Sequence, residues 1–204
     1  IPLFELLVSR GADLSSTDRN GWNSLLISCS RGHLNIVRKL LRHFDLNQSS
    51  DRSGLTPLMV AALGGHSSLV SFLIERGSEI DSRDLFKRTA LMMACDMNHL
   101  DIVRILLDNG SDPNIEDQEG ATALMIASSR GNTQIIQLLI DHKAKMDARD
   151  REGQNPLMIA SHFGHVEVVR LLLGKRNKAG KGVGSKAQDK RGLTALMIAC
   201  LNNH

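Results

Sequence analysis

Apolar residues recur at helical spacing in short segments along the chain. Within each segment the spacing i, i+1, i+4, i+5 places four side chains on one face of a helix. The four clearest sets are Leu69, Val70, Leu73 and Ile74; Ile102, Val103, Leu106 and Leu107; Ile135, Ile136, Leu139 and Ile140; and Val168, Val169, Leu172 and Leu173. A short helix of this kind cannot bury its apolar face alone, so these segments are expected to pack against one another.

An aspartate marks the start of each unit of an internal repeat. The series Asp18, Asp51, Asp84, Asp117 and Asp150 advances by 33 residues at each step, and Asp189 follows after 39. Three residues after the aspartate stands a glycine in every unit except the third, which has Lys87. A repeat of this period is the unit of the fold, and the last interval contains an insertion.

Each repeat carries signals for a first helix. The sixth position is always a residue type that caps helix N-termini: Asn23, Thr56, Thr89, Thr122, Asn155 and Thr194. Nine residues later stands a residue type that ends helices: Gly32, Gly65, Asn98, Gly131, Gly164 and Asn203. The apolar sets above then form a second helix, which we expect to stop at Gly77 and Gly110 in two of the repeats.

Residues 54–81, 120–142 and 153–173 resemble ankyrin repeats, and the resemblance extends over nearly the whole chain. It implies an all-α ankyrin-repeat solenoid of stacked helix–turn–helix units joined by β-hairpin-like loops. It also implies a non-catalytic scaffold for protein–protein interaction. One departure is systematic, because the family's usual histidine is replaced by Leu26, Met59, Met92, Met125, Met158 and Met197. We expect these side chains to pack in the core.

The repeat register divides the chain into five complete repeats with half a repeat at each end, within one domain over 1–204. The expected boundaries are 1–17 (a second helix over Pro2 to Arg10), 18–50, 51–83, 84–116, 117–149, 150–188 and 189–204. Neither end resembles a polar capping repeat, so we expect the chain to be part of a longer array.

Composition excludes several classes of protein. The chain has 204 residues, 42% of them hydrophobic, and a formal charge of +3. It has no apolar run long enough to span a membrane and no signal peptide, so we expect an intracellular protein of the cytoplasm or nucleus. Scarce aromatic residues argue against nucleic-acid binding. Cys29, Cys95 and Cys200 are odd in number and widely spaced, so we expect reduced packing residues.

No motif indicates catalysis, a metal or a cofactor. His33, His66, His99, His165 and His204 occupy one repeat position, which favours a structural role over metal binding. Each repeat-start aspartate is expected to accept hydrogen bonds from its own turn. We therefore predict a protein that is not an enzyme and has no catalytic residue, metal site or cofactor.

The positions that the repeat pattern leaves free suggest a partner-binding face. In ankyrin arrays these are the hairpin tips and two exposed positions of the first helix, and here they include eight basic and three acidic residues together with large apolar ones. We predict a protein or peptide partner, apolar with acidic flanks, bound on the concave face. The alternative is that these are ordinary scattered surface residues. The predicted contacts are Arg19, Trp22, Arg31, Arg52, Leu55, Leu63, Leu85, Phe86, Arg88, Met97, Arg130 and Phe163.

The insertion at 174–188 is a second candidate surface. It contains Lys175, Arg176, Lys178, Lys181 and Lys186, four glycines and no acid. A solvated loop is the simplest interpretation, and recognition of nucleic acid or acidic phospholipid is the alternative function. A mechanical or assembly role in a larger channel or cytoskeletal adaptor also stays open, as does the oligomeric state.

The family resemblance implies one modification. Asparagine in the tail motif of ankyrin repeats is a substrate of an oxygen-sensing asparaginyl hydroxylase in many members. The segment LLDNGSDPN at 106–114 matches that motif and LLRHFDLN at 40–47 is close to it. Asn114 is the expected site, with Asn47 the weaker candidate.

Overall fold

The computed structural model describes residues 2–47, 52–174 and 184–204. Within these residues the secondary structure is helical, with no strand. The chain divides into two compact units, Ile1–Ser111 and Asp112–His204. The repeat boundaries predicted above, and a single domain over 1–204, stay predictions.

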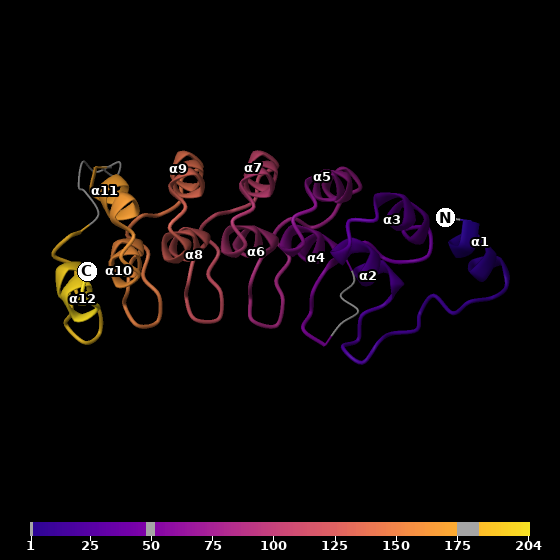
Figure 1. Cartoon of the computed structure of the whole chain (residues 1–204), viewed down its shortest axis with the longest axis horizontal. Helices are drawn as coiled ribbons and strands as arrows, with labels where there is room; N and C mark the ends of the chain where they lie inside the picture. The colour runs from indigo at the N-terminus through magenta and orange to yellow at the C-terminus, as the bar shows by residue number, and fades with distance from the viewer. Residues whose placement is uncertain (1, 48–51, 175–183) are drawn as a thin grey trace. The chain divides into compact units, whose positions relative to one another are not determined.

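The first unit contains a row of first helices and a row of second helices. Its helices are α1 (Pro2–Ser9), α2 (Ser24–Ser30), α3 (Leu34–Leu40), α4 (Pro57–Leu63), α5 (Ser67–Glu75), α6 (Ala90–Asp96) and α7 (Leu100–Asp108). Helices α2, α4 and α6 pack side by side, and each packs against the second helix that follows it. The connecting hairpins extend from the first helices on the side opposite the second helices (Figure 1).

The second unit repeats this arrangement. It contains α8 (Ala123–Arg130), α9 (Thr133–Asp141), α10 (Pro156–His162), α11 (Val166–Gly174) and α12 (Ala195–Leu201). Helix α10 packs between α8 and α12, while α9 and α11 form the neighbouring row (Figure 1).

The predicted caps begin the first helices. Asn23 and Asn155 accept from the backbone N–H of the third helical residue at 3.0 and 2.9 Å. Thr56, Thr89 and Thr194 make the same bond at 3.3–3.4 Å. Thr122 is also an N-cap residue, as predicted, but the expected side-chain bond is not formed, because its buried hydroxyl has no hydrogen-bond partner among the described residues. The threonine side chain is one atom shorter than asparagine and already spans this distance at its limit elsewhere.

The predicted helix ends are confirmed by the backbone. All six predicted stops of the first helices have positive φ, including Asn98 at 59° and Asn203 at 61°. Gly77 and Gly110, which follow α5 and α7, are also left-handed. Lys87 has φ of 61° at the hairpin position that is glycine in the other repeats. The repeat therefore imposes this conformation even on a side chain that disfavours it.

The core consists of the apolar faces predicted from helical spacing. Leu69, Val70, Leu73, Ile102 and Val103 are at most 1% exposed. Leu173 is a correction, because it is 48% exposed at the end of α11. The residues that replace the family's histidine are buried in the first five repeats, as predicted, and Met197 is half exposed on α12. No helix in the described part of the chain is long and apolar enough to cross a membrane.

The repeat-start aspartates close their own hairpins, as predicted from the sequence. In the third repeat the Asp84 N–H donates to the Arg88 carbonyl at 3.0 Å, and Asp84 Oδ1 accepts from Phe86 N and Arg88 N. Asp18, Asp117, Asp150 and Asp189 accept equivalent bonds, and Asp51 lies outside the described residues.

Neighbouring hairpins are joined by single backbone hydrogen bonds. In the first unit Leu85 N donates to the Ser53 carbonyl at 2.9 Å. In the second unit Arg151 N donates to Glu119 O and Lys190 N to Glu152 O. The hairpins of adjacent repeats are therefore held in register along their edges within each unit.

Candidate functional site

The hairpin of the third repeat presents two apolar side chains to solvent. Leu85 is 68% exposed and Phe86 is 54% exposed. Their backbone is held from below by Asp84, which is itself 5% exposed, and from the side by the bond between Leu85 N and Ser53 O. Two large apolar residues are therefore exposed, as predicted, on a hairpin whose backbone is hydrogen-bonded; their contact with a partner stays a prediction.

Arg88 is anchored inside the same hairpin. Its Nη2 and Nε lie 2.8 and 2.9 Å from Asp84 Oδ2. Its guanidinium carbon lies 5.2 Å from the centroid of the Phe86 ring, within the range of a cation–π contact. The sequence pattern predicts Arg88 as a partner-facing cation. Its side chain is 42% exposed while it pairs with Asp84, and its contact with a partner stays a prediction.

The first-helix positions of the first unit differ in exposure. Met97, which follows α6, is 49% exposed, and Leu63, at the end of α4, is half-buried. Arg31 is exposed at the end of α2. The exposure expected for Leu55 is wrong, because it is only 8% exposed and packs largely in the core; its contact with a partner stays a prediction.

The first two hairpins line a shallow, open hollow of about 380 Å³. Arg19, Asn20 and Trp22 line it from the first hairpin, and Arg52, Ser53 and Leu55 line it from the second. Four of these six residues are partner contacts predicted from the sequence. The structure therefore brings Arg19, Trp22, Arg52 and Leu55 together in one place.

The remaining predicted contacts belong to the second unit. Arg130 is exposed at the end of α8. Phe163, which follows α10, is 51% exposed and stacks on His165 with a centroid distance of 6.1 Å. Their participation in one surface with the residues of the first unit stays a prediction.

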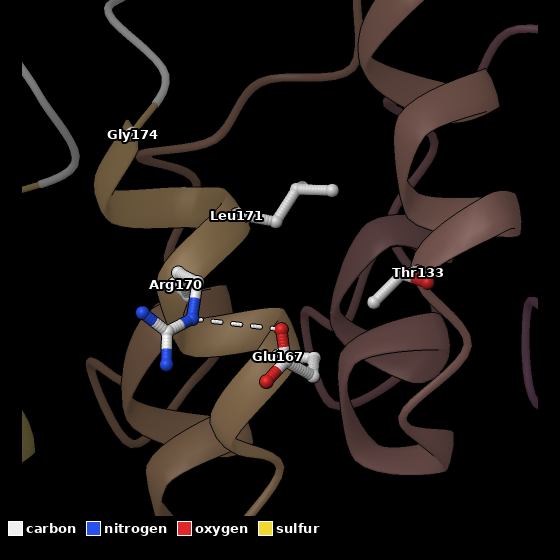
Figure 2. A pocket seen from close by; sticks show the side chains of 5 residues that line it. All are labelled: Thr133, Glu167, Arg170, Leu171 and Gly174. Carbon is white, nitrogen blue, oxygen red and sulfur yellow. Dashed lines mark ion pairs between the residues drawn. The ribbon is translucent and has the colours of Figure 1, made fainter.

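A second hollow, of about 490 Å³, is not predicted by the sequence pattern. It lies between α9 and α11 and is lined by Thr133, Glu167, Arg170, Leu171 and Gly174 (Figure 2). Arg170 Nε lies 3.5 Å from Glu167 Oε2, and both side chains are more than 70% exposed. An exposed pair of this kind contributes little energy. These residues lie on the exposed side of the second helices and differ in type from repeat to repeat, so no periodic signal identifies them.

The recurrent histidines serve the stack of repeats. His66 Nε2 lies 2.9 Å from the Ser30 carbonyl, and His165 Nε2 lies 2.9 Å from the Ser129 carbonyl. Each ring therefore hydrogen-bonds the end of the preceding first helix, which supports the structural interpretation. In the described part of the chain no three His, Cys, Asp or Glu residues group as metal ligands would.

The cysteines fall into two environments. Cys29 and Cys95 are fully buried, and burial raises the pKa of the Cys29 thiol to about 12. Burial likewise raises the pKa of Cys95. The packing role expected for Cys200 is wrong, because this residue is exposed on α12. Buried thiols with raised pKa values are poor nucleophiles, which agrees with the packing role predicted for Cys29 and Cys95.

The two candidate hydroxylation sites join neighbouring repeats. Asn114 Oδ1 accepts from Lys145 N at 2.8 Å, and its Nδ2 donates to the Lys143 carbonyl at 3.3 Å. Asn47 Oδ1 accepts from Glu79 N at 2.9 Å. Both asparagines thus have the same structural role, one in each unit.

The basic insertion is only partly described. Lys175, Arg176, Lys178 and Lys181 lie outside the described residues, and Lys186 is exposed. The basic charge of this segment is therefore known from the sequence alone, and its role as a binding surface stays a prediction.

Comparison with known proteins agrees with the repeat pattern. The family model for ankyrin repeats matches in three overlapping copies, over residues 1–84, 80–117 and 91–183. A search of curated proteins returned no match. Ankyrin repeats generally act as protein–protein interaction modules and are typically non-catalytic. With these matches over most of its length and paired helices joined by hairpins, the chain belongs to the ankyrin-repeat family.

Proposed function

We propose that the protein is a non-enzymatic interaction scaffold that binds an apolar segment of a partner protein. The contact surface consists of the hairpin tips and first-helix ends of the first unit, centred on Leu85, Phe86 and Met97. The observation that carries the proposal is the exposure of Leu85 and Phe86 on a hairpin whose backbone is held by hydrogen bonds from below and from the side.

A rigid apolar tip favours binding because little conformational entropy remains to be lost on association. Asp84 and Arg88 hold the Phe86 ring and its backbone in place before a partner arrives. Arg19, Arg31 and Arg52 are exposed in the same unit. Their charge supports a partner whose apolar segment has acidic flanks.

We also propose that the partner binds on the concave side, as the family resemblance implies. An intracellular location is likewise part of the proposal. Two thiols kept buried and unpaired support a reducing compartment.

The test is to isolate a partner by cross-linking and to measure its affinity by calorimetry. Phe86→Ala should weaken binding about thirtyfold, or about 2 kcal/mol, because a central aromatic anchor is lost. Leu173→Ala removes a comparably exposed apolar residue from α11 and serves as the matched control. Equal affinity of the Phe86→Ala variant and the wild type would contradict the proposal.

The same titration tests the basic insertion. Lys181→Glu should change affinity by less than about 0.5 kcal/mol, because an exposed loop charge is screened by salt. If this variant loses most of the binding while Phe86→Ala binds normally, the insertion is the working surface. Binding that falls steeply with salt would then favour an anionic polymer or lipid as the ligand.

A further inference from the structure

We propose that the hollow between the first two hairpins binds an aspartate or glutamate side chain that stands beside an apolar residue in an extended partner segment. The binding residues are Arg19, Trp22, Arg52 and Leu55. The inference rests on the proposed scaffold function but uses residues other than Phe86. It specifies the acidic position of the partner and where that position binds.

The apolar part of the hollow is preformed. Trp22 ends the first hairpin, where its N–H donates to Asp18 Oδ1 and its carbonyl accepts from Asp18 N, both at 2.9 Å. The Trp22 side chain is half-buried, and Leu55 is 8% exposed. Trp22 and Leu55 thus supply the apolar part of the lining, on a hairpin whose backbone is already hydrogen-bonded.

Among the residues that the structure describes, no acidic side chain lines the hollow or pairs with its two arginines. None of the six lining residues is acidic. Asp18, the nearest described carboxylate in sequence, accepts the N–H groups of Asn20 and Trp22. Within the described ranges neither Arg19 nor Arg52 forms an ion pair, and both are exposed.

Arginines in other hairpins form ion pairs or hydrogen bonds within the fold. Arg88 and Arg191 pair with the buried aspartates of their own repeats, Asp84 and Asp189. Arg149 Nη1 donates to the carbonyls of Gly153 and Gln188 at 2.7 Å. Arg19 and Arg52 have no such partner in the part of the chain that the structure describes, so their donors are available to a ligand.

The donor set matches a carboxylate. A guanidinium binds a carboxylate through two parallel hydrogen bonds, and two guanidiniums flank this hollow. Asn20 and Ser53, which also line the hollow, carry neutral side-chain donors. A volume of about 380 Å³ admits one or two side chains, so the ligand is part of an extended segment rather than a folded element.

The first experiment selects ligands from random sequences, so it does not require an identified partner. A phage-displayed library of random peptides, each about a dozen residues long, is panned on the whole chain and, in parallel, on the Arg19→Gln/Arg52→Gln variant. Wild-type selections should enrich Asp or Glu within two positions of a large apolar residue. The variant should lose the acidic enrichment. Equal acidic enrichment on both proteins would overturn the proposal.

The second experiment is a double-mutant cycle by fluorescence anisotropy, using the most enriched peptide and its Glu→Gln counterpart. The double variant should bind the acidic peptide at least tenfold more weakly than wild type. The Gln peptide should lose a similar factor on wild type and little more on the variant. Arg151→Gln, an exposed hairpin arginine of the second unit, is the matched control.

The same peptide separates failure of this inference from failure of the proposed function. Loss of binding in Phe86→Ala with normal binding in the double variant leaves the scaffold proposal standing and overturns the hollow. The reverse result supports the hollow and overturns the surface centred on Phe86. A phosphoserine peptide that binds more than tenfold tighter than the glutamate peptide would overturn carboxylate specificity.

Discussion

The imidazole of His66 occupies the space in which a side chain at Gly32 would stand. A Cβ built on Gly32 would lie 2.6 Å from His66 Nδ1, and the other ring nitrogen is 2.9 Å from the Ser30 carbonyl. Gly65 and His99 repeat this relationship one layer further on, as do Gly131 and His165 in the second unit. The glycine thus ends its own helix, and its lack of a side chain leaves room for the histidine ring of the next repeat.

Gly32→Ala should therefore destabilise the protein more than Gly77→Ala does. Both glycines have positive φ, at 66° and 92°, so alanine costs about 1 kcal/mol at either position. Only at Gly32 must the His66 ring also move and weaken its bond to Ser30, whereas nothing lies within 4 Å of a Cβ at Gly77. Urea unfolding should show the extra loss for Gly32→Ala. Equal losses would mean that the His66 contact contributes no stability.

Leu106→Ala and Leu139→Ala should each lower the free energy of unfolding by about 2–5 kcal/mol. Both side chains are fully buried, in α7 and α9 respectively, so truncation leaves a cavity within the stack. Arg104→Ala, at an exposed position of α7, should change stability by less than about 0.5 kcal/mol. Urea melts that show no more loss for the leucine variants than for Arg104→Ala would refute the assigned register.

Asp150 and Asp189 occupy equivalent positions, but their contributions to stability should change with pH in opposite directions. Burial raises the pKa of Asp150 above its ordinary value of 3.8, and the N–H bonds from Gln154 and Glu152 do not offset it. Burial also acts to raise the pKa of Asp189, but the N–H of Leu193, the Arg191 guanidinium and the Arg191 N–H together lower it below 3.8.

Ionised Asp189 therefore stabilises the fold above about pH 4, and this contribution disappears as pH falls through its lowered pKa. Ionised Asp150 costs stability above its raised pKa, and that cost is absent below about pH 3.8. The destabilisation caused by Asp189→Asn should be larger at pH 7 than at pH 3. The free energy of unfolding of Asp150→Asn, relative to that of the wild type, should be higher at pH 7 than at pH 3. Urea melts at both values test this, and parallel shifts would contradict it.

Asn114 should carry a hydroxyl group in protein from animal cells, and more fully than Asn47. Its segment matches the family motif more closely. Because Asn114 bonds Lys143 and Lys145, the hydroxylase must first release this tail from the next repeat. Peptide mass spectrometry would detect the added oxygen. Wholly unmodified Asn114 would count against the assignment, and Lys145→Pro, which removes the N–H donor, should increase occupancy.

The parts of the fold that recur in the sequence could be predicted, because each is imposed in every repeat. The aspartate, the helix cap and the left-handed stop each satisfy local backbone groups, so the same residue types return at the same positions. The buried methionines followed from their register in the first helix.

The features that depend on two repeats at once could not be predicted in this way. Leu55 is buried because the hairpin after it lies alongside, joined through Leu85 N and Ser53 O. The ion pair between Arg88 and Asp84 occurs where other repeats have Trp22, Leu55 or Ala121, so no periodic signal indicates it. The hollow likewise needs the spatial relation of two hairpins.

Because the three cysteines differ in exposure, one of them can be labelled selectively. Thiol reagents attack the thiolate, so Cys29 and Cys95, buried and with raised pKa values, should remain unmodified near neutral pH. Cys200 is exposed and should react alone. A single fluorophore or cross-linker can therefore be attached to α12 of the native sequence, without removing any cysteine, to immobilise the chain with the hairpins of its first unit unmodified.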